Sequence, residues 1–176
     1  MRIEIVVGNI VAQPDAEAII NSANANLRFG SGVAGAIHTA AGQELEEFCK
    51  PFAPLHLGKA LITPAFNLPN KSIIHLRAGH YLIEEDPEKI LNEALNSMLT
   101  LVKENNIKSI AIPAIGTGVF KFPISIAADI IIKSLQNDSE NSTLEWARIC
   151  VANQNTLSVF KNTWYPDDIQ YSNQKL

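Results

Sequence analysis

Hydrophobic and polar positions alternate along the chain in two distinct patterns. Short runs rich in β-branched residues predict strands, and longer stretches with apolar residues three or four positions apart predict helices. We predict six strands, over residues 2–7, 18–21, 59–63, 72–76, 109–112 and 147–152. Several of these runs contain consecutive apolar residues, which is typical of strands buried on both faces of a sheet.

Helical patterns lie between these strands and after them. The clearest opens at Asp86, an N-cap residue, with Pro87 in its first turn, and ends near 105–106. Others begin near Gly32, follow Pro123, and span 156–162. Strands that alternate with helices in this way predict an α/β layered sheet with helices on both faces, in which ligands bind at the carboxyl ends of the strands.

The composition is that of one folded domain. Of the 176 residues 47% are hydrophobic, enough for a sizeable core, so we predict a single domain over 1–166 followed by a polar tail over 167–176. The net charge of -4 offers no basic surface to a polyanion, which disfavours sequence-specific nucleic acid as a partner. No apolar run approaches the roughly 20 residues of a membrane span.

The cysteines predict a reducing environment. Cys49 and Cys150 are far apart and no secretion signal precedes them, so we expect two buried thiols and a cytoplasmic location. A structural zinc needs about four ligands in close pairs. Cys49 and His56 form no such pair, so we predict no metal, and no cofactor.

Amide side chains, a glycine-rich turn and a helix follow one another between residues 21 and 41. Asn21 and Asn24 stand at the end of the second predicted strand, and the turn Gly30-Ser31-Gly32-Val33-Ala34-Gly35 follows. Glycines let the backbone approach an anion, and the start of a helix offers unpaired N–H groups at its positive end. This order predicts a cradle for a sugar phosphate.

The three spaced glycines also match the fingerprint of dinucleotide-binding enzymes. In that fingerprint the first glycine directly follows a strand, whereas residues 23–29 intervene here. No acidic residue ends a following strand to hold a ribose. The context therefore argues against a redox dinucleotide, while a role as plain turn glycines stays open for this motif taken alone.

A second glycine loop, Gly116-Thr117-Gly118-Val119-Phe120, leaves the strand at 109–112 and leads to the helix after Pro123. Its glycines would expose N–H groups, Thr117 could add a hydroxyl, and Phe120 could offer its ring to a ribose. Two such loops can hold one diphosphate.

Together these segments resemble the macrodomain family of ADP-ribose-binding modules, and the resemblance covers most of the chain. Gly8-Asn9-Ile10 is similar to the family's Gly-Asp-Ile, 21–24 to its Asn-Ala-Ala-Asn, 30–41 to its glycine loop and helix, 65–69 to its Asn-Leu-Pro strand end, and 116–120 to its second loop. The resemblance implies a three-layer α/β/α fold around a mixed six-stranded sheet, with ADP-ribose in a cleft between the loops.

The resemblance also implies residue roles. Asn9 stands where an acidic residue accepts a hydrogen bond from adenine, and the uncharged amide would lower affinity by about 1 kcal/mol. Asn24 would bind the distal ribose, and Asn153 would contact the adenosine or simply start a turn. The predicted ligand-binding residues are Asn9, Ile10, Ala23, Asn24, Gly30, Ser31, Gly32, Val33, Ala34, Gly116, Thr117, Gly118, Val119, Phe120 and Asn153.

Two residues are candidates for catalysis, Asn24 and His38. One hydrolase branch of the family has an aspartate in place of Ala34, facing a histidine in place of His38. A spacing of four places residues 34 and 38 on one helical face, so we expect His38 to face the cleft without a carboxylate partner. The alternative is a histidine that only packs on the helix face. Phe29 stands where a viral branch carries a histidine.

We therefore expect the protein to bind ADP-ribose or a derivative, such as mono-ADP-ribosylated protein or O-acetyl-ADP-ribose. Weak hydrolysis of the ADP-ribosyl ester would use a water that Asn24 helps to orient, since orientation lowers a barrier without a strong base. Ala34 and Phe29 favour a binding-only reader instead. Asn9 and Ser31 keep open a fold relative with another nucleotide ligand, because a positive φ at Ser31 would cost about 1 kcal/mol.

Overall fold

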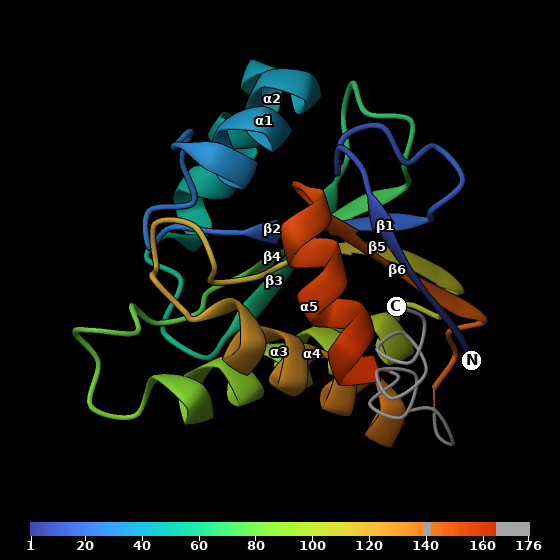
Figure 1. Ribbon diagram of the computed structural model, residues 1–176. Helices are drawn as coiled ribbons and strands as arrows, with labels where there is room; N and C mark the ends of the chain where they lie inside the picture. Colours follow the sequence, from blue (N-terminus) through green and yellow to red (C-terminus); the bar gives the residue numbers. More distant parts are fainter. Residues whose placement is uncertain (139–141, 165–176) are drawn as a thin grey trace, which may run out of the picture.

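The structure, a computed structural model, describes residues 1–138 and 142–164 (Figure 1). Its strands are β1 (Arg2–Val7), β2 (Ala18–Ser22), β3 (Ala60–Pro64), β4 (Ser72–Leu76), β5 (Ser109–Pro113) and β6 (Trp146–Val151). They form one sheet in the order β1-β6-β5-β2-β4-β3, in which β3 alone runs antiparallel to its neighbour. The predicted mixed six-stranded sheet is confirmed.

Helices cover both faces of this sheet, as Figure 1 shows. On one face lie α1 (Gly32–Ala41) and α2 (Gln43–Cys49), followed by the short 3-10 helix η1 (Lys50–Phe52). On the other lie α3 (Pro87–Glu104), α4 (Ile124–Asp138) and α5 (Gln154–Trp164). The three-layer α/β/α arrangement is therefore also confirmed.

Alternating residues of the central strands supply two hydrophobic cores. On β2, Ala18 and Ile20 pack into the core under α3, α4 and α5, whereas Ile19 packs into the core under α1 and α2. Every residue of β5 is buried. Burial on both faces explains why these strands carry consecutive apolar residues rather than alternating apolar and polar ones.

The differences from the predicted elements are small, apart from one helix. β2 and β5 each extend one residue further, to Ser22 and Pro113, β3 lies one residue later and β6 one residue earlier than expected. The last helix, α5, extends two residues beyond the predicted 156–162 at each end. The sequence pattern predicts neither α2 nor η1. With seven residues and two buried side chains, Leu45 and Cys49, α2 is too short to produce a clear helical period. The predicted tail, 167–176, lies outside the described residues.

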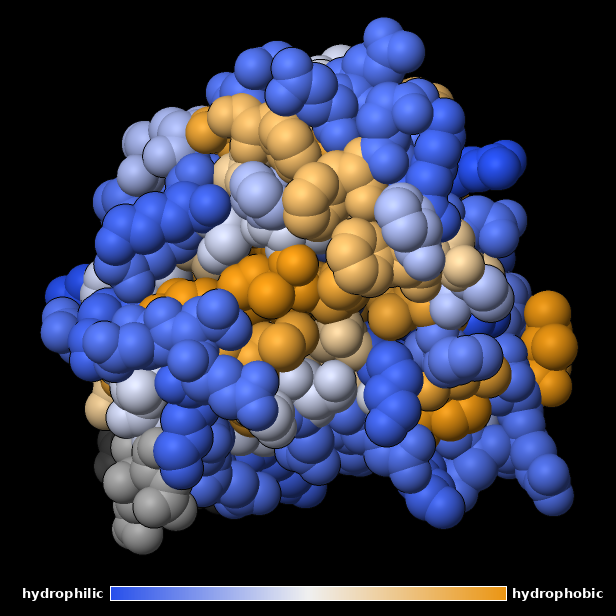
Figure 2. All heavy atoms as spheres, turned by 180° about the vertical axis from the view of Figure 1, so that it is seen from behind, coloured by the Kyte–Doolittle hydropathy of each residue, from blue (hydrophilic) through white to orange (hydrophobic). Residues whose placement is uncertain are grey.

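The outer surface of α2 and η1 carries aromatic side chains. The rings of Phe48 and Phe52 lie 5.7 Å apart, and Phe66 lies 5.9 Å from Phe48. Figure 2 shows that apolar residues also reach the surface on the face opposite to the view of Figure 1. On α2 itself, Phe48 lies beside the acidic residues Glu44, Glu46 and Glu47, so the exposed side of this helix is mixed rather than uniformly polar.

The parallel strands bring both glycine loops to one edge of the sheet. β2, β5 and β6 are parallel to one another, so Ser22, Pro113 and Val151 all lie at the carboxyl edge. The first glycine loop connects β2 to α1, and the second connects β5 to α4. A ligand site is expected at such an edge.

The start of α1 packs tightly against the loop that precedes it. A Cβ atom added at Gly35 would overlap the carbonyl oxygen of Gly30. We predict that Gly35→Ala lowers the free energy of unfolding by about 1–3 kcal/mol, because the backbone must move apart to admit the methyl group. Urea unfolding measures this change.

Gly118→Ala is the matched control. A Cβ atom at Gly118 meets nothing within 4 Å, so this variant should stay within about 0.5 kcal/mol of the wild type. If Gly35→Ala is as stable as Gly118→Ala, the close approach of loop and helix is not required for folding.

Candidate functional site

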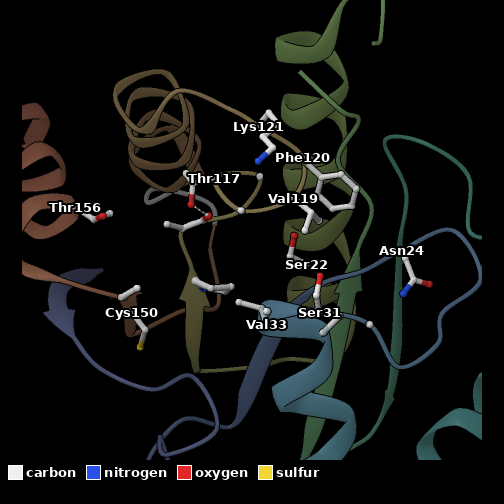
Figure 3. Close-up of a pocket in the computed structure, with 18 residues that line it drawn as sticks. Ser22, Asn24, Ser31, Val33, Thr117, Val119, Phe120, Lys121, Cys150 and Thr156 are labelled. Atoms are coloured by element: carbon white, nitrogen blue, oxygen red, sulfur yellow. Dashed lines mark hydrogen bonds between the residues drawn. The ribbon is translucent and has the colours of Figure 1, made fainter. Parts of the chain in front are cut away.

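A cleft of about 890 Å³ opens at the carboxyl edge of the sheet, between the two glycine loops. Figure 3 shows its walls, with Val33 and Ser31 from the first loop facing Val119 and Phe120 from the second. The structure brings together most of the predicted ligand-binding residues in this lining, namely Asn24, Gly30, Ser31, Gly32, Val33, Ala34, Gly116, Thr117, Gly118, Val119 and Phe120.

The first wall is the start of α1. The N–H groups of Gly32, Val33 and Ala34 have no protein acceptor within the described residues, as is usual in the first turn of a helix. Ser31 is the N-cap residue, but its hydroxyl does not cap the helix. Together with the helix dipole, these donors make the wall a site for a negatively charged group.

The strain expected at Ser31 is absent. Ser31 has a φ of -89°, an ordinary extended conformation, and the positive φ of this turn, 59°, falls on Gly32. The concern that Ser31 would distort the loop was therefore wrong. A glycine directly after the serine takes the left-handed conformation at little cost.

The side chain of Asn24 is fixed by two hydrogen bonds to the backbone of the loop that follows it. Its amide nitrogen donates to the carbonyl of Arg28 at 2.8 Å, and its oxygen accepts from the Arg28 N–H at 3.1 Å. One amide hydrogen and one lone pair are left to face the cleft. In Figure 3, Asn24 lies at one end of the cleft, and Cys150 and Thr156 lie at the other.

The second wall is the loop from Gly116 to Phe120. Gly116 has a φ of 83°, and an added Cβ would lie 2.7 Å from the ring of Phe122, so only glycine fits there. The Tyr81 N–H donates to the Phe120 carbonyl at 2.7 Å and fixes the outer end of the loop. Within the described residues, the N–H groups of Gly118, Val119 and Phe120 have no acceptor, so they are available to a ligand.

Thr117 lines the cleft, but its hydroxyl is already used. It donates to the carbonyl of Ala114 at 2.8 Å, the dashed line in Figure 3. In this arrangement the hydroxyl oxygen can only accept, so it has no hydrogen to donate to a phosphate, in contrast to the role predicted for Thr117. Its structural role is to close the turn that follows β5.

Four predicted binding residues do not line the cleft. Ile10 and Ala23 are buried, 5% and 1% exposed, in the core under α1. Asn153 accepts from the N–H and the hydroxyl of Thr156, at 2.9 and 3.1 Å, so it starts the turn into α5. Starting a turn was the second role that the sequence left open for Asn153. Its neighbours in the chain, Ala152 and Thr156, line the cleft instead.

Asn9 lies outside the lining, close to the end of β6. Its side-chain oxygen accepts from the Val11 N–H at 3.2 Å, and the Gly8 N–H donates to the carbonyl of Val151 at 3.1 Å. The Asn9 carbonyl accepts from the side chain of Gln13 at 2.9 Å. The loop is therefore docked beside the Cys150 end of the cleft.

Arg148 on β6 holds the segment that follows Asn9 against the sheet. Its guanidinium makes a bidentate pair with Asp15 at 2.8 and 2.9 Å and also binds Glu4 and Gln13. The hydrogen bonds from Arg148 lower the pKa of Asp15. Arg148 thereby connects the segment that carries Asn9 to the strand next to the cleft.

Several lining residues were not anticipated: Ser22, Pro113, Ala114, Lys121, Cys150, Ala152 and Thr156. Most of them stand at a strand end or just beyond it, which the predicted strands alone could have indicated. Burial raises the pKa of the Cys150 thiol to about 11, so it is an unreactive wall residue. Both cysteines are buried, as expected.

The structure does not bring His38 to the cleft. His38 is 6% exposed and lines a separate hollow of about 220 Å³ with Phe29, Gly42, Gln43, Glu46 and Glu47. Its ring centroid lies 6.3 Å from that of His75. Burial lowers its pKa, although the charge of Glu46 opposes this shift. The geometry therefore fits the alternative of a histidine that packs on a helix face, and we do not retain His38 as a catalytic candidate.

His75 lies in the centre of the molecule, fully buried on β4. The Thr63 hydroxyl donates to the carbonyl of Pro64, so it accepts from Nε2 of His75 at 3.1 Å. Asn21 then donates its amide N–H to Nδ1 at 3.0 Å. Burial and the nearby His38 lower the pKa of His75 to about 3, so the ring stays neutral.

Asn21 is therefore a structural residue, although it belongs to the same sequence motif as Asn24. It lies beside the His75 network, whereas Asn24 lines the cleft. Within residues 1–138 and 142–164, no group of three or more His, Cys, Asp or Glu side chains is arranged to hold a metal ion. In the same ranges, no helix is long and apolar enough to cross a membrane.

The fold and the cleft define an α/β module built to hold a ligand between two backbone loops. The family model for the Macro domain matches residues 20–131, and the chain belongs to the macrodomain family. The resemblance noted in the sequence is thus confirmed.

Relatives and solved structures agree with this assignment. The chain is 39% identical over 145 residues to the O-acetyl-ADP-ribose deacetylase of Salmonella gallinarum, covering 77% of this chain and 78% of that protein. The Oceanobacillus iheyensis macrodomain with ADP has a TM-score of 0.89 at 30% identity, covering 96% of this chain and 92% of that one. A mutant of that macrodomain with ADPR has a TM-score of 0.86 at 31% identity, covering 98% and 94%.

The buried His75 predicts how stability depends on pH. Its pKa is about 3 in the folded protein against an ordinary value of 6.5, so below about pH 6.5 the unfolded chain binds a proton that the folded one refuses. The free energy of unfolding should fall as the pH drops from about 6.5 to 5, with this residue adding a slope of up to about 1.4 kcal/mol per pH unit.

Urea unfolding at several pH values measures this slope, in a window above the range where most carboxylates titrate. His75→Gln should reduce the slope even if it lowers stability at every pH. His56→Gln, the same substitution at an exposed histidine, is the matched control. An unchanged slope in His75→Gln would show that His75 is protonated in the folded protein.

Proposed function

We propose that this protein binds ADP-ribose, free or as part of O-acetyl-ADP-ribose or a mono-ADP-ribosylated protein, in the cleft between the two glycine loops. The observation that carries the proposal is the convergence of unpaired N–H groups from both loops on one cleft. Membership of the macrodomain family and the ADP and ADPR complexes of its structural relatives support it.

The shape and chemistry of the cleft suit a nucleotide diphosphate sugar. Its volume, about 890 Å³, lies within the range typical of ligand sites. The diphosphate would lie between Gly32–Ala34 and Gly118–Phe120, where backbone donors face each other across the cleft. The distal ribose would lie at the Asn24 end and the adenosine near Thr156, with Asn9 at the rim.

We further propose slow hydrolysis of ester-linked ADP-ribose. Asn24, with its remaining amide hydrogen and lone pair, would orient a water beside the distal ribose. The water oxygen would add to the ester carbonyl carbon, and the bond from that carbon to the ribose oxygen would break. The ribose oxygen would take one proton from the water and the carboxylic acid would release another to solvent. Orientation of this kind lowers a barrier without a strong base.

A binding-only reader is the second candidate, and one observation favours it. Among the described residues that line the cleft, none has a carboxylate or an imidazole that could act as a general base. His38 lies in a different hollow. Hydrolysis, if it occurs, depends on water orientation alone. For either function the cytoplasm remains the predicted location.

Gly118→Glu tests the site. The new side chain starts in open space, so the protein should fold, and its carboxylate would enter the cleft where we place the diphosphate. We predict a loss of ADP-ribose affinity of more than about tenfold, from bulk and like-charge repulsion. Calorimetric titration with ADP-ribose measures it.

Gly118→Gln separates the two causes. It adds almost the same bulk without charge, so its affinity should lie between those of the wild type and the glutamate variant. A glutamate variant that binds as the wild type does would move the ligand site away from this loop.

Asn24→Ala tests the hydrolysis. We predict that it slows the single-turnover release of ADP-ribose from O-acetyl-ADP-ribose by more than it weakens ADP-ribose binding, because Asn24 orients the water as well as the ribose. Asn26→Ala, at an exposed position of the same loop, is the control for loop stability. If the wild type releases no more ADP-ribose than buffer does, the protein is a reader.

A further inference from the structure

Lys121 has a strained backbone conformation at the end of the second glycine loop. Its φ is 60°, in the left-handed region that side chains with a Cβ rarely adopt. The described residues include three other non-glycine positions of this kind, Leu27, Phe66 and Asn106. Lys121 is the only one of the four that lines the cleft.

The hydrogen bonds of the loop enforce this conformation. The Lys121 N–H donates to the carbonyl of Gly118 at 3.1 Å, and the Phe122 N–H donates to that of Gly116 at 2.9 Å. Phe122 is 3% exposed and packs against Gly116, so the chain must turn sharply at residue 121. Glycine would make this turn without strain. A lysine there needs a compensating role, because strained residues gather at functional sites.

The charge of Lys121 is unusual for its surroundings. Among the described residues that line the cleft, Lys121 is the only one with a charged side chain. The chain as a whole carries a net charge of -4. The other donors on these walls are backbone N–H groups and neutral side chains such as Asn24 and Ser31, which supply only partial charges.

The side chain is placed to reach a ligand. Lys121 is exposed, and Figure 3 shows it next to Phe120 and Val119 on the loop that forms the second wall. It lies on the opposite side of the cleft from the start of α1. A lysine has a flexible four-carbon stem, so its ammonium can follow a phosphate group that binds between the two walls.

We propose that Lys121 binds the phosphate groups of the ligand through its ammonium, and so makes affinity depend on ligand charge and ionic strength. The inference rests on the proposed function. It adds a side-chain cation to a site otherwise built from backbone dipoles. The strain at residue 121 is the cost of placing that cation at the mouth of the cleft.

Lys121→Gln and Lys121→Arg test this role. We expect the glutamine variant to bind ADP-ribose about tenfold more weakly than the wild type at low salt, and the arginine variant to stay within about threefold. The difference between wild type and glutamine variant should shrink at high salt, because salt screens exposed charges. Calorimetric titration at two salt concentrations measures both effects. Lys103→Gln, at an exposed lysine on α3, controls for the change in net charge.

Lys121→Gly separates a binding role from a structural one. It removes the charge together with the strain, so affinity should fall as in Lys121→Gln. Its melting temperature should rise by about 2–4 °C as the left-handed strain is relieved. If Lys121 only held the loop, a variant with a higher melting temperature would not bind ADP-ribose more weakly.

The outcomes separate the two proposals. If the wild type and Lys121→Gln bind ADP-ribose equally at low salt, the role of Lys121 is overturned and the proposed function stands. If the wild type does not bind ADP-ribose, the proposed function fails and this inference fails with it. A salt-sensitive loss in Lys121→Gln, absent from Lys103→Gln, supports both.

Discussion

The site depends on backbone N–H groups that the fold leaves without partners. The start of α1 and the loop after β5 both present such groups to one cleft, where no acceptor among the described residues reaches them. Unpaired donors are costly when they are buried, so they must stay open to water or a ligand. The parallel order of β2, β5 and β6 meets this requirement, because it places both loops at one exposed edge.

Keeping those donors aligned requires rigid loops, and different contacts fix each wall. On the first wall, Gly35 lets the helix touch Gly30. The side-chain amide of Asn24 donates to the carbonyl of Arg28 and accepts from its N–H. On the second, Phe122 packs under Gly116. Preorganised donors lose little entropy when a ligand binds, so this rigidity favours affinity. It also leaves the strain of the second loop at residue 121, where the chain turns back.

The same architecture limits the chemistry. The two buried histidines, His38 and His75, have lowered pKa values because of their burial, and neither lines the cleft. Cys150 faces the cleft with a raised pKa. None of these groups is suited to take a proton from a substrate. What the cleft offers is binding and orientation, which is why hydrolysis, where it occurs, would be slow.

The sequence alone determined the six strands, the longer helices and the two glycine loops, but not α2 or η1. Strand and helix periods repeat locally, and glycine runs require a backbone geometry that few other residues adopt, so both leave a signal in the order of residues. Tertiary structure decided which side chains reach the cleft. His38 shares a helix with Ala34 yet lines another hollow, Asn153 caps a helix while Thr156 takes the wall, and strain falls on Lys121 rather than Ser31. Which of these side chains reaches the cleft depends on how segments distant in the sequence pack, and local spacing does not give that packing. The Asn153 cap and the turn at Lys121 are local contacts, but only the packed structure shows where they stand relative to the cleft.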